Sequence, residues 1–399
     1  MYKLTKKQWS IVIACFLLLA INVGAFNNST SVFIIPVTND LDFARGAFTF
    51  YRTITTLIGA ALMPLYGTLL KRYGIKKVML ISSVIRGLVF SCYGFSNELW
   101  HFYLIAGFEG LVLNGVSFMS VGVVINKYFN KNKGFAGAIA FSGSGVAAFI
   151  VPQLTKLIET FNWRVVFFWE GIIGAILAIV IILLMINDKN NYSDNSKKEV
   201  KSNTGYSATQ ALKLASFWSL AIAFFLLNFL SRGGSVNMQP HLQDVGFNAI
   251  FAAGIYSLYM ILLTVGKLML GPIYDKLGIR VGNIIVCLSM MLYPLSAYFS
   301  GTIAVAPYLF AIFLGFGAAG VSVPLNILVS DCFGDKDFSV IFSRLNMIGA
   351  IGTAISAPAI ASVYDFTGST NIAWLILIIL AVISFIALSF SHSWARNQR

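Results

Sequence analysis

The stretch GTLLKRYGIKKV, residues 67–78, returns 204 residues later as GPIYDKLGIRVG, residues 271–282. Each version carries a glycine at its start and another seven residues later, Gly74 and Gly278. Cationic side chains flank the second glycine in both versions, and a long apolar run precedes both. Similarity at such a distance indicates a chain built from two copies of one structural plan.

The composition identifies the solvent that surrounds most of the chain. Of 399 residues, 58% are hydrophobic and only 11% are charged, and the mean hydropathy is +0.80. A soluble protein of this length has no interior large enough to hide so much apolar surface, so we expect lipid around it. A bilayer core needs roughly 20 apolar residues for each helical crossing, and the sequence predicts twelve crossings. The runs are 9–37, 47–70, 77–97, 101–126, 134–156, 163–187, 215–238, 249–272, 281–299, 303–330, 339–363 and 371–392.

The twelve runs fall into two sets of six. Residues 188–214 are the longest polar stretch and predict a cytoplasmic linker between an N-terminal bundle, residues 1–187, and a C-terminal bundle, residues 215–399. Proline repeats between the halves as well, because Pro358 follows Pro152 by 206 residues. Parallel repeats of six helices are a transporter architecture, with the substrate site between the repeats near the bilayer midplane. The predicted fold is an all-α membrane protein with twelve transmembrane helices in two pseudo-symmetric bundles.

The basic charge of the chain follows the membrane and does not point to nucleic acid. The net charge is +13, from 28 Lys and Arg against 15 Asp and Glu. With a cytoplasmic N-terminus, 21 of the 28 cations fall in the N-terminal tail, the even-numbered loops or the C-terminal tail. This distribution obeys the positive-inside rule and predicts a multi-pass protein of the cytoplasmic membrane with both termini in the cytoplasm. We expect no nucleic-acid partner.

Around the repeated pattern the chain resembles the major facilitator superfamily, whose loop after helix 2 reads roughly G-x-L-x-D-R-x-G-R-R/K. Lys71 departs from this pattern, because the family usually has aspartate there. The resemblance implies transport by alternating access and assigns the two loops to the conformational change. The matching residues are Gly67, Leu69, Arg72, Gly74, Lys76 and Lys77 in the first copy, and Gly271, Asp275, Lys276, Gly278 and Arg280 in the second.

A finer resemblance is to the branch that contains oxalate:formate exchangers and monocarboxylate porters. Three stretches carry it: LDFARGAFTFYRTI at 41–54, NKYFNKNKGFAGAIAFSGSGVAAFIVPQL at 126–154, and PHLQDVGF at 240–247. In this branch an arginine on helix 8, four residues before the motif glycine, contacts the substrate carboxylate. Lys267 occupies that position here. The resemblance therefore implies that Lys267 binds a carboxylate, without the bidentate geometry of a guanidinium.

The helix face that carries Lys267 also carries polar and aromatic groups. Thr264, Tyr259 and Tyr256 stand 3, 8 and 11 residues before it, on the same side of a helix. An ammonium, a hydroxyl and two phenols suit a small anion with an apolar end. The alternative is a lysine that snorkels to the cytoplasmic surface, about 10 Å away along the helix. The residues alone leave both interpretations open.

Other charges also lie inside the predicted helices. Arg52, Glu109 and Arg232 each stand roughly 25 Å from the cytoplasmic end of their helix. Arg52 and Glu109 are expected to form a structural ion pair within one half, and Arg232 is expected to reach across the cleft. The alternative is a gating or proton-linked role, because carboxylates in transporter cavities commonly titrate. The resemblance implies a peripheral position for Arg86, because helix 3 is usually peripheral in this fold, and the residues identify no partner for it. Glu170 is likewise unexplained, and such a residue is more often structural.

Amide side chains also occur within the apolar runs. Helices 1, 4, 7 and 10 usually line the cavity in this superfamily, which implies that Asn27, Asn114 and Asn228 line it here. Hydrogen bonding between helices is the alternative role for amides inside a membrane.

The predicted function is secondary transport of a small organic anion, coupled to a proton or to an exchanged anion. Oxalate exchangers of this branch place a second cation on helix 11, whereas residues 346–363 contain no ionisable side chain here. We therefore expect a monocarboxylate, because a dianion would keep an uncompensated charge. Two alternatives stay open: proton-coupled efflux of an amphipathic compound, and a transporter-derived membrane sensor. No nucleotide motif, nucleophile–base pair or metal cluster occurs in the sequence, so we expect no enzyme activity and no cofactor. We also expect a monomer.

The topology predicts one-sided labelling of the linker. In a variant whose four native cysteines are replaced by alanine, a single cysteine at Ser196 will react with a membrane-impermeant maleimide in inside-out vesicles and not in intact cells. The five lysines of residues 188–214 favour the cytoplasmic side. Labelling of intact cells would contradict this orientation.

Overall fold

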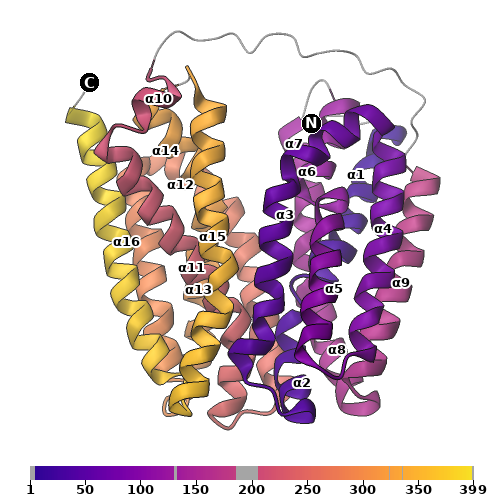
Figure 1. Cartoon of the computed structure of the whole chain (residues 1–399). Coiled ribbons are helices and arrows are strands. Elements are labelled where there is room, and N and C mark those ends of the chain that lie inside the picture. The colour runs from indigo at the N-terminus through magenta and orange to yellow at the C-terminus, as the bar shows by residue number, and fades with distance from the viewer. Residues whose placement is uncertain (1–4, 130–132, 186–204, 323, 335, 398–399) are drawn as a thin grey trace. The chain divides into compact units, whose positions relative to one another are not determined.

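The computed structural model describes residues 5–129, 133–185, 205–322, 324–334 and 336–397. These residues are helical almost throughout, with no β-strand among them and one isolated β-bridge, between Gly205 and Gly334. The chain divides into two units, Met1–Asn195 and Ser196–Arg399. Each unit is a bundle of long helices (Figure 1), which confirms the all-α prediction.

The first unit passes through the first six predicted crossings in order. Several of these crossings consist of consecutive segments, because short 3₁₀ or π turns interrupt the α-helix. The segments are α1 (Lys6–Leu19), η1 (Ala20–Ala25), η2 (Thr30–Phe33), α2 (Ile34–Leu41), α3 (Arg45–Tyr73), α4 (Ile75–Cys92), η3 (Tyr93–Phe95), α5 (Leu99–Val112), η4 (Leu113–Val116), α6 (Phe118–Tyr128), α7 (Lys133–Ser142), η5 (Gly143–Val146), α8 (Ala147–Phe161) and α9 (Trp163–Met185).

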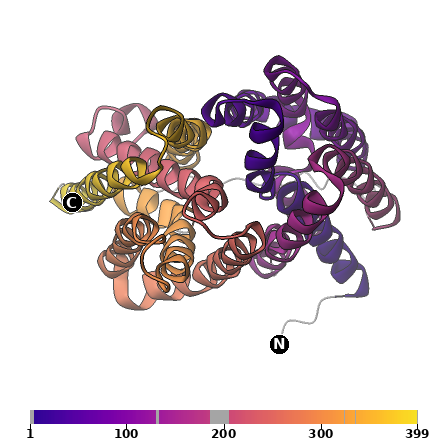
Figure 2. The ribbon, with the colours of Figure 1, turned by 90° about the horizontal axis from the view of Figure 1, so that it is seen from below.

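The second unit contains the remaining crossings in longer helices. Its segments are α10 (Ala208–Ala211), α11 (Ala215–Asp244), α12 (Ala249–Tyr298), α13 (Ala306–Ser322), α14 (Pro324–Phe333), α15 (Phe338–Thr367) and α16 (Asn371–Asn397). The element α12 contains two crossings. They meet at Gly278, where the backbone leaves the helical conformation. Figure 2 views the helices of each unit along their axes.

Ten helical runs of the described residues are long and apolar enough to cross a membrane. The other two predicted crossings, 47–70 and 303–330, are helical too, as α3 and as α13 with α14. All twelve predicted runs therefore lie on helices, and the predicted boundaries agree with the helix ends to within several residues.

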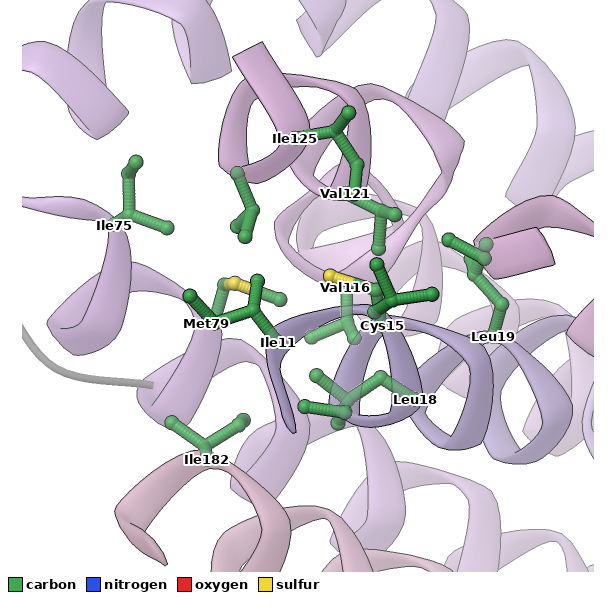
Figure 3. Close-up of a cluster of buried hydrophobic side chains, with 14 of the residues drawn as sticks. Ile11, Cys15, Leu18, Leu19, Ile75, Met79, Val116, Val121, Ile125 and Ile182 are labelled. Atoms are coloured by element: carbon green, nitrogen blue, oxygen red, sulfur yellow. The ribbon is translucent and has the colours of Figure 1, made fainter. Parts of the chain in front are cut away.

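An apolar cluster fills the first unit toward one end of its helices. Ile11, Cys15 and Leu18 on α1 point toward Met79 on α4 and Ile182 on α9 (Figure 3), and all of these side chains are buried. Lipid tails are as apolar as these side chains, so the cluster stabilises the bundle through close packing more than through the removal of water. The polar groups described below lie outside this cluster.

The last part of the predicted linker belongs to the second unit. The N–H of Tyr206 donates to the carbonyl of Phe333 at 2.9 Å, and the N–H of Ala208 donates to a carboxylate oxygen of Asp337 at 2.8 Å. Arg344 donates to the carbonyl of Ala208 at 3.3 Å. Residues 205–214 are thus fixed to the second unit, and the linker residues before them lie outside the described residues.

The repeated pattern takes a similar turn in both units. Gly74, between α3 and α4, has φ 85° and ψ 149°, and Gly278 has φ 83° and ψ 166°. This conformation strains residues other than glycine, although Asn162 adopts similar angles, φ 82° and ψ 148°, after α8. Gly67 and Gly271 lie within helices, so only the second glycine of each pattern makes the turn. The side chain of Asp275 lies outside the described part of the chain. Exposed cations accompany both turns, namely Arg72, Lys276 and Arg280.

We expect Gly278→Ala to destabilise the protein by about 1–3 kcal/mol, because alanine is strained at this φ and ψ. No atom lies within 4 Å of the added Cβ, so a clash does not contribute. Gly254 is a matched control in the same helix: its Cβ would also meet no atom within 4 Å, but its backbone is helical. Gly254→Ala should be neutral or stabilising by up to about 1 kcal/mol. Thermal unfolding in detergent measures both, and equal melting temperatures would argue against the strained turn.

Candidate functional site

The first crossing changes its helical pitch near its middle. A π-helical segment, Ala20–Ala25, continues α1, and the N–H of Phe26 donates to the carbonyl of Ile21 at 3.1 Å, five residues back. A π turn contains more residues than an α turn, so side chains five positions apart come to the same side. Asn22 and Asn27 are such a pair, and both point toward α4.

Arg86 on α4 donates hydrogen bonds to both of these amides. The Oδ1 atom of Asn27 accepts from Nη2 of Arg86 at 2.8 Å, and that of Asn22 accepts from Nη1 at 3.5 Å. The same Nη2 lies 3.2 Å from Oε1 of Glu109 on α5. Arg86 is completely buried, and a buried guanidinium needs a counter-ion and acceptors. The expectation of a peripheral position for Arg86 is therefore wrong, and the structure supplies the partners that the sequence did not identify.

Arg52 on α3 approaches the same two partners from another helix. Its Nη1 lies 3.2 Å and 3.3 Å from the two carboxylate oxygens of Glu109, so the predicted ion pair is present. Its Nη2 donates to Oδ1 of Asn27 at 2.6 Å. One amide oxygen of the first crossing thus accepts hydrogen bonds from two arginines on two other helices.

Glu109 is the one carboxylate that these two arginines share. It is fully buried, and its Oε2 also accepts a hydrogen bond from the hydroxyl of Tyr93 at 3.1 Å. Two guanidiniums against one carboxylate leave this charge cluster with a formal charge of +1. The Nε atoms of Arg52 and Arg86 are buried and have no hydrogen-bond partner among the described residues. A buried donor without an acceptor costs about 1–3 kcal/mol, so the cluster is short of negative charge and of acceptors.

The charge cluster connects four helices of the first unit. Asn27 follows η1, Arg52 lies on α3, Arg86 lies on α4 and Glu109 lies on α5. Two guanidiniums and a phenol donate hydrogen bonds to Glu109. The arrangement suits a brace between helices, and it suits proton transfer poorly because every donor around Glu109 stabilises the carboxylate.

The other two amides that were predicted to line a cavity make contacts between helices. Asn114 is buried and donates to the carbonyl of Gly59 on α3 at 2.5 Å. Asn228 on α11 donates to the carbonyl of Phe224 in its own helix at 2.8 Å, and it accepts from Thr353 on α15 at 3.3 Å. The bonds of Asn114 to Gly59 and of Thr353 to Asn228 fit the alternative role, which is hydrogen bonding between helices.

In the second unit, Arg232 on α11 lies close to two phenols of α12. It interacts electrostatically with both Tyr256 and Tyr259, and its carbonyl accepts from the hydroxyl of Ser235 at 3.1 Å. The two tyrosine rings meet edge to face with centroids 5.4 Å apart, and both side chains are buried. That Arg232 reaches across a cleft stays a prediction.

The side chain of Lys267 differs from the other intramembrane cations. It is exposed, and it forms no hydrogen bond or ion pair with any residue that the structure describes. On the same helix face Tyr256 is buried, and the half-buried Thr264 donates to the carbonyl of Met260 at 3.0 Å. This face of α12 therefore runs from a buried side chain at Tyr256 to an exposed side chain at Lys267.

The two units place their polar groups at corresponding positions. Arg232 follows Asn27 by 205 residues, and Tyr256 follows Arg52 by 204 residues. These offsets match that of the repeated loop pattern. In each unit a contact between the first and second crossings is made at this depth, with an amide and an arginine in one unit and an arginine and a phenol in the other.

The sequence did not point to three members of the charge cluster: Asn22, Arg86 and Tyr93. One signal was available for Arg86. An arginine in the middle of an apolar run needs a counter-ion, and Glu109 and Glu170 are the two carboxylates within the first six runs. No sequence signal identifies the π segment, which has no proline and reads AINVGA.

Comparison with known proteins gives a family match over most of the chain. A family model described as Major Facilitator Superfamily matches residues 15–357. Monocarboxylate transporter 12 of Mus musculus is 23% identical and aligns over 98% of this chain and 86% of its own length. The uncharacterized MFS-type transporter YhjX of Escherichia coli (strain K12) is 24% identical, over 73% of this chain and 75% of the relative.

Solved structures share the fold at lower sequence identity. A bacterial homolog of the human lysosomal transporter Spinster, in an inward-facing and unoccupied conformation, has a TM-score of 0.76 at 15% identity, covering 99% of this chain and 98% of that chain. The nucleoside transporter NupG has a TM-score of 0.77 at 14% identity, covering 97% of this chain and 99% of that chain. These similarities show the twelve-helix, two-bundle fold.

The charge count of the cluster predicts an order of stability. Glu109→Gln leaves two buried guanidiniums without a counter-ion and should destabilise the protein by about 3–5 kcal/mol or more. Arg86→Met keeps a similar volume and leaves one guanidinium with one carboxylate, so it should destabilise less. Melting temperatures of both variants in detergent test this order. An Arg86→Met protein that melts below Glu109→Gln would show that charge balance does not govern the cluster.

Proposed function

The chain belongs to the major facilitator superfamily, a family of membrane transporters, and from this premise we propose that it moves a small monocarboxylate across the cytoplasmic membrane by alternating access. In this proposal both termini are cytoplasmic and the substrate moves together with a proton or in exchange for another anion. The curated relatives named monocarboxylate transporter support this substrate class.

The balance of charge inside the helices supports an anionic substrate. Ionisable side chains in spanning helices are costly and commonly mark ligand or ion pathways. Here cations outnumber carboxylates, so a substrate anion would supply missing negative charge. The cations are Arg52, Arg86, Arg232 and Lys267, and the carboxylates are Glu109 and Glu170.

The observation that carries the proposal is the state of Lys267. Its side chain is exposed and makes no ion pair with a described residue, although it lies within a membrane-length helix. The arginines of the charge cluster already share Glu109. We therefore assign the substrate carboxylate to Lys267, and we assign the charge cluster to bracing the first unit.

The position of Lys267 also favours one shape of substrate. Helical rise places Tyr259 about 12 Å and Tyr256 about 16 Å from Lys267 along α12, and a lysine side chain in a helix points back toward them. A carboxylate at Lys267 would therefore need an apolar tail to approach the phenols, with the hydroxyl of Thr264 on the way. This supports monoanions that carry a short apolar group.

Uptake by variants of Lys267 tests the assignment. In proteoliposomes, Lys267→Gln should reduce uptake of a labelled monocarboxylate at least tenfold, because the charge that binds the carboxylate is lost. Lys267→Arg should keep part of the activity. Lys276→Gln removes an exposed cation from the loop that follows and serves as the matched control. Wild-type uptake by Lys267→Gln would remove this lysine from the site.

Competition between anions tests the charge of the substrate. Pyruvate and hexanoate should compete with a bound monocarboxylate at lower concentrations than oxalate or malonate, because a dianion at one lysine keeps an uncompensated charge in a low-dielectric environment. Stronger competition by oxalate would show that a second cation enters the site.

Measured flux separates this proposal from the two alternatives. A sensor would bind a monocarboxylate without moving it, and an efflux protein for amphipathic compounds would export those compounds along a pH gradient while leaving hexanoate in place. The same proteoliposomes, with and without a pH gradient, distinguish proton symport from anion exchange.

A further inference from the structure

A cavity of about 620 Å³ lies in the first unit, on the other side of the Phe26 ring from the charge cluster. The π segment, α8 and α9 line it, and its wall is apolar apart from one carboxylate, that of Glu170 on α9. Small side chains give it room, because Ala20 and Ala25 lie on the π segment and Gly174 lies on α9. Neither the transport proposal nor the family resemblance assigns a role to this space.

The cavity has an exposed apolar rim. Several of its lining side chains are more than 40% exposed: Leu157, Phe161, Val165, Trp169, Ile173 and Leu177. We infer from its apolar character that this rim faces the bilayer, which would let a solute dissolved in the lipid enter directly. The end of α8 and the start of α9 border the cavity, and the predicted topology places them near the outer face.

Glu170 has no cationic partner among the residues that the structure describes. Its Oε1 atom lies 3.3 Å from the hydroxyl of Ser29, and that hydroxyl is also bonded to the carbonyl of Ala25. A hydroxyl has one hydrogen to donate, so Glu170 receives at most a shared hydrogen bond from it. Its Oε2 atom is buried and has no hydrogen-bond partner among the described residues. The buried guanidinium of Arg86 is bonded to Glu109 and to the asparagines.

Phe26 separates the two polar regions of the first unit. Its ring lines the cavity, and the guanidinium carbon of Arg86 lies 5.4 Å from the ring centroid. A Cβ added at Gly174 would meet the Phe26 ring at 2.4 Å, so the ring fits closely against α9. The positive charge cluster and the carboxylate of the cavity thus lie near each other without forming an ion pair in the described residues.

We propose that this cavity binds a hydrophobic amine in its protonated form, with the ammonium at Glu170 and the apolar body against the π segment, α8 and α9. An isolated carboxylate in apolar surroundings is stabilised by a cation that donates hydrogen bonds to it. An apolar wall of this size matches the body of an amphipathic molecule. Entry from the bilayer selects a ligand that partitions into lipid. Two other states compete with this complex. In one, Glu170 is protonated and the cavity holds no ligand, and in the other an acyl chain fills the cavity.

Binding of decylamine to the full-length protein in phosphatidylcholine nanodiscs tests the proposal, with empty nanodiscs to subtract partitioning. Alkylamines are protonated at neutral pH, as lysine is, and decanol is a neutral probe with the same chain. Wild-type protein should bind one decylamine saturably and at least tenfold more tightly than decanol. Glu170→Gln should lose at least tenfold in decylamine affinity and leave decanol unchanged.

A second pair of variants keeps the test independent of the carboxylate. Ile173→Trp adds bulk at the cavity rim and should weaken decylamine binding at least tenfold. Ile176→Trp makes the same change at an exposed position of α9 outside the cavity and should not. Equal affinities for decylamine and decanol, or equal affinities in the wild-type and Glu170→Gln proteins, would show a groove for acyl chains and overturn the proposal. The assay measures no carboxylate transport, so its outcome is separate from that of the transport proposal.

Discussion

The ion pairs of Glu109 are the interaction on which the first unit depends. The charged partners of Glu109 on α5 come from α3 and α4, and Asn27 adds an acceptor from the first crossing. Four helices therefore meet at one point inside the membrane. No water is available there to replace a lost hydrogen bond. The cluster is nevertheless incomplete in charge, because one carboxylate serves two guanidiniums. The two arginines share one carboxylate, so the position of each guanidinium limits the position of the other.

The π segment is the local device that allows this meeting. By placing Asn22 and Asn27 on one side of the first crossing, it gives Arg86 two amide acceptors besides the shared carboxylate. The small residues of the same segment leave the cavity on the other side, next to Glu170. One change of helical pitch therefore creates a polar contact and an apolar space back to back. Such π turns occur frequently at functional sites.

Much of this architecture follows from the sequence, for physical reasons. Long apolar runs give the crossings because a bilayer accepts few polar residues, and the repeated glycines give the turns because Gly74 and Gly278 adopt backbone angles that other residues avoid. The pairing of Arg52 with Glu109 follows from depth along the helices. The place of Arg86 does not, because depth does not show which way a helix faces. The π segment is also hidden, since helical propensity does not distinguish AINVGA from an ordinary helix.

The second unit repeats the plan with different chemistry, and its exposed lysine is the residue that we propose as the binding site of the transported ligand. Because Lys267 has no counter-ion among the described residues, a ligand with a negative charge should be preferred over a neutral one of the same shape. The most direct test is the melting temperature of the purified protein in the presence of hexanoate and of hexanamide, which differ in charge and little in size. The cation excess predicts that hexanoate raises the melting temperature in a saturable way and that hexanamide does not. An equal shift with hexanamide, or a shift with neither while Lys267→Gln melts as the wild type does, would contradict an anion site at this lysine.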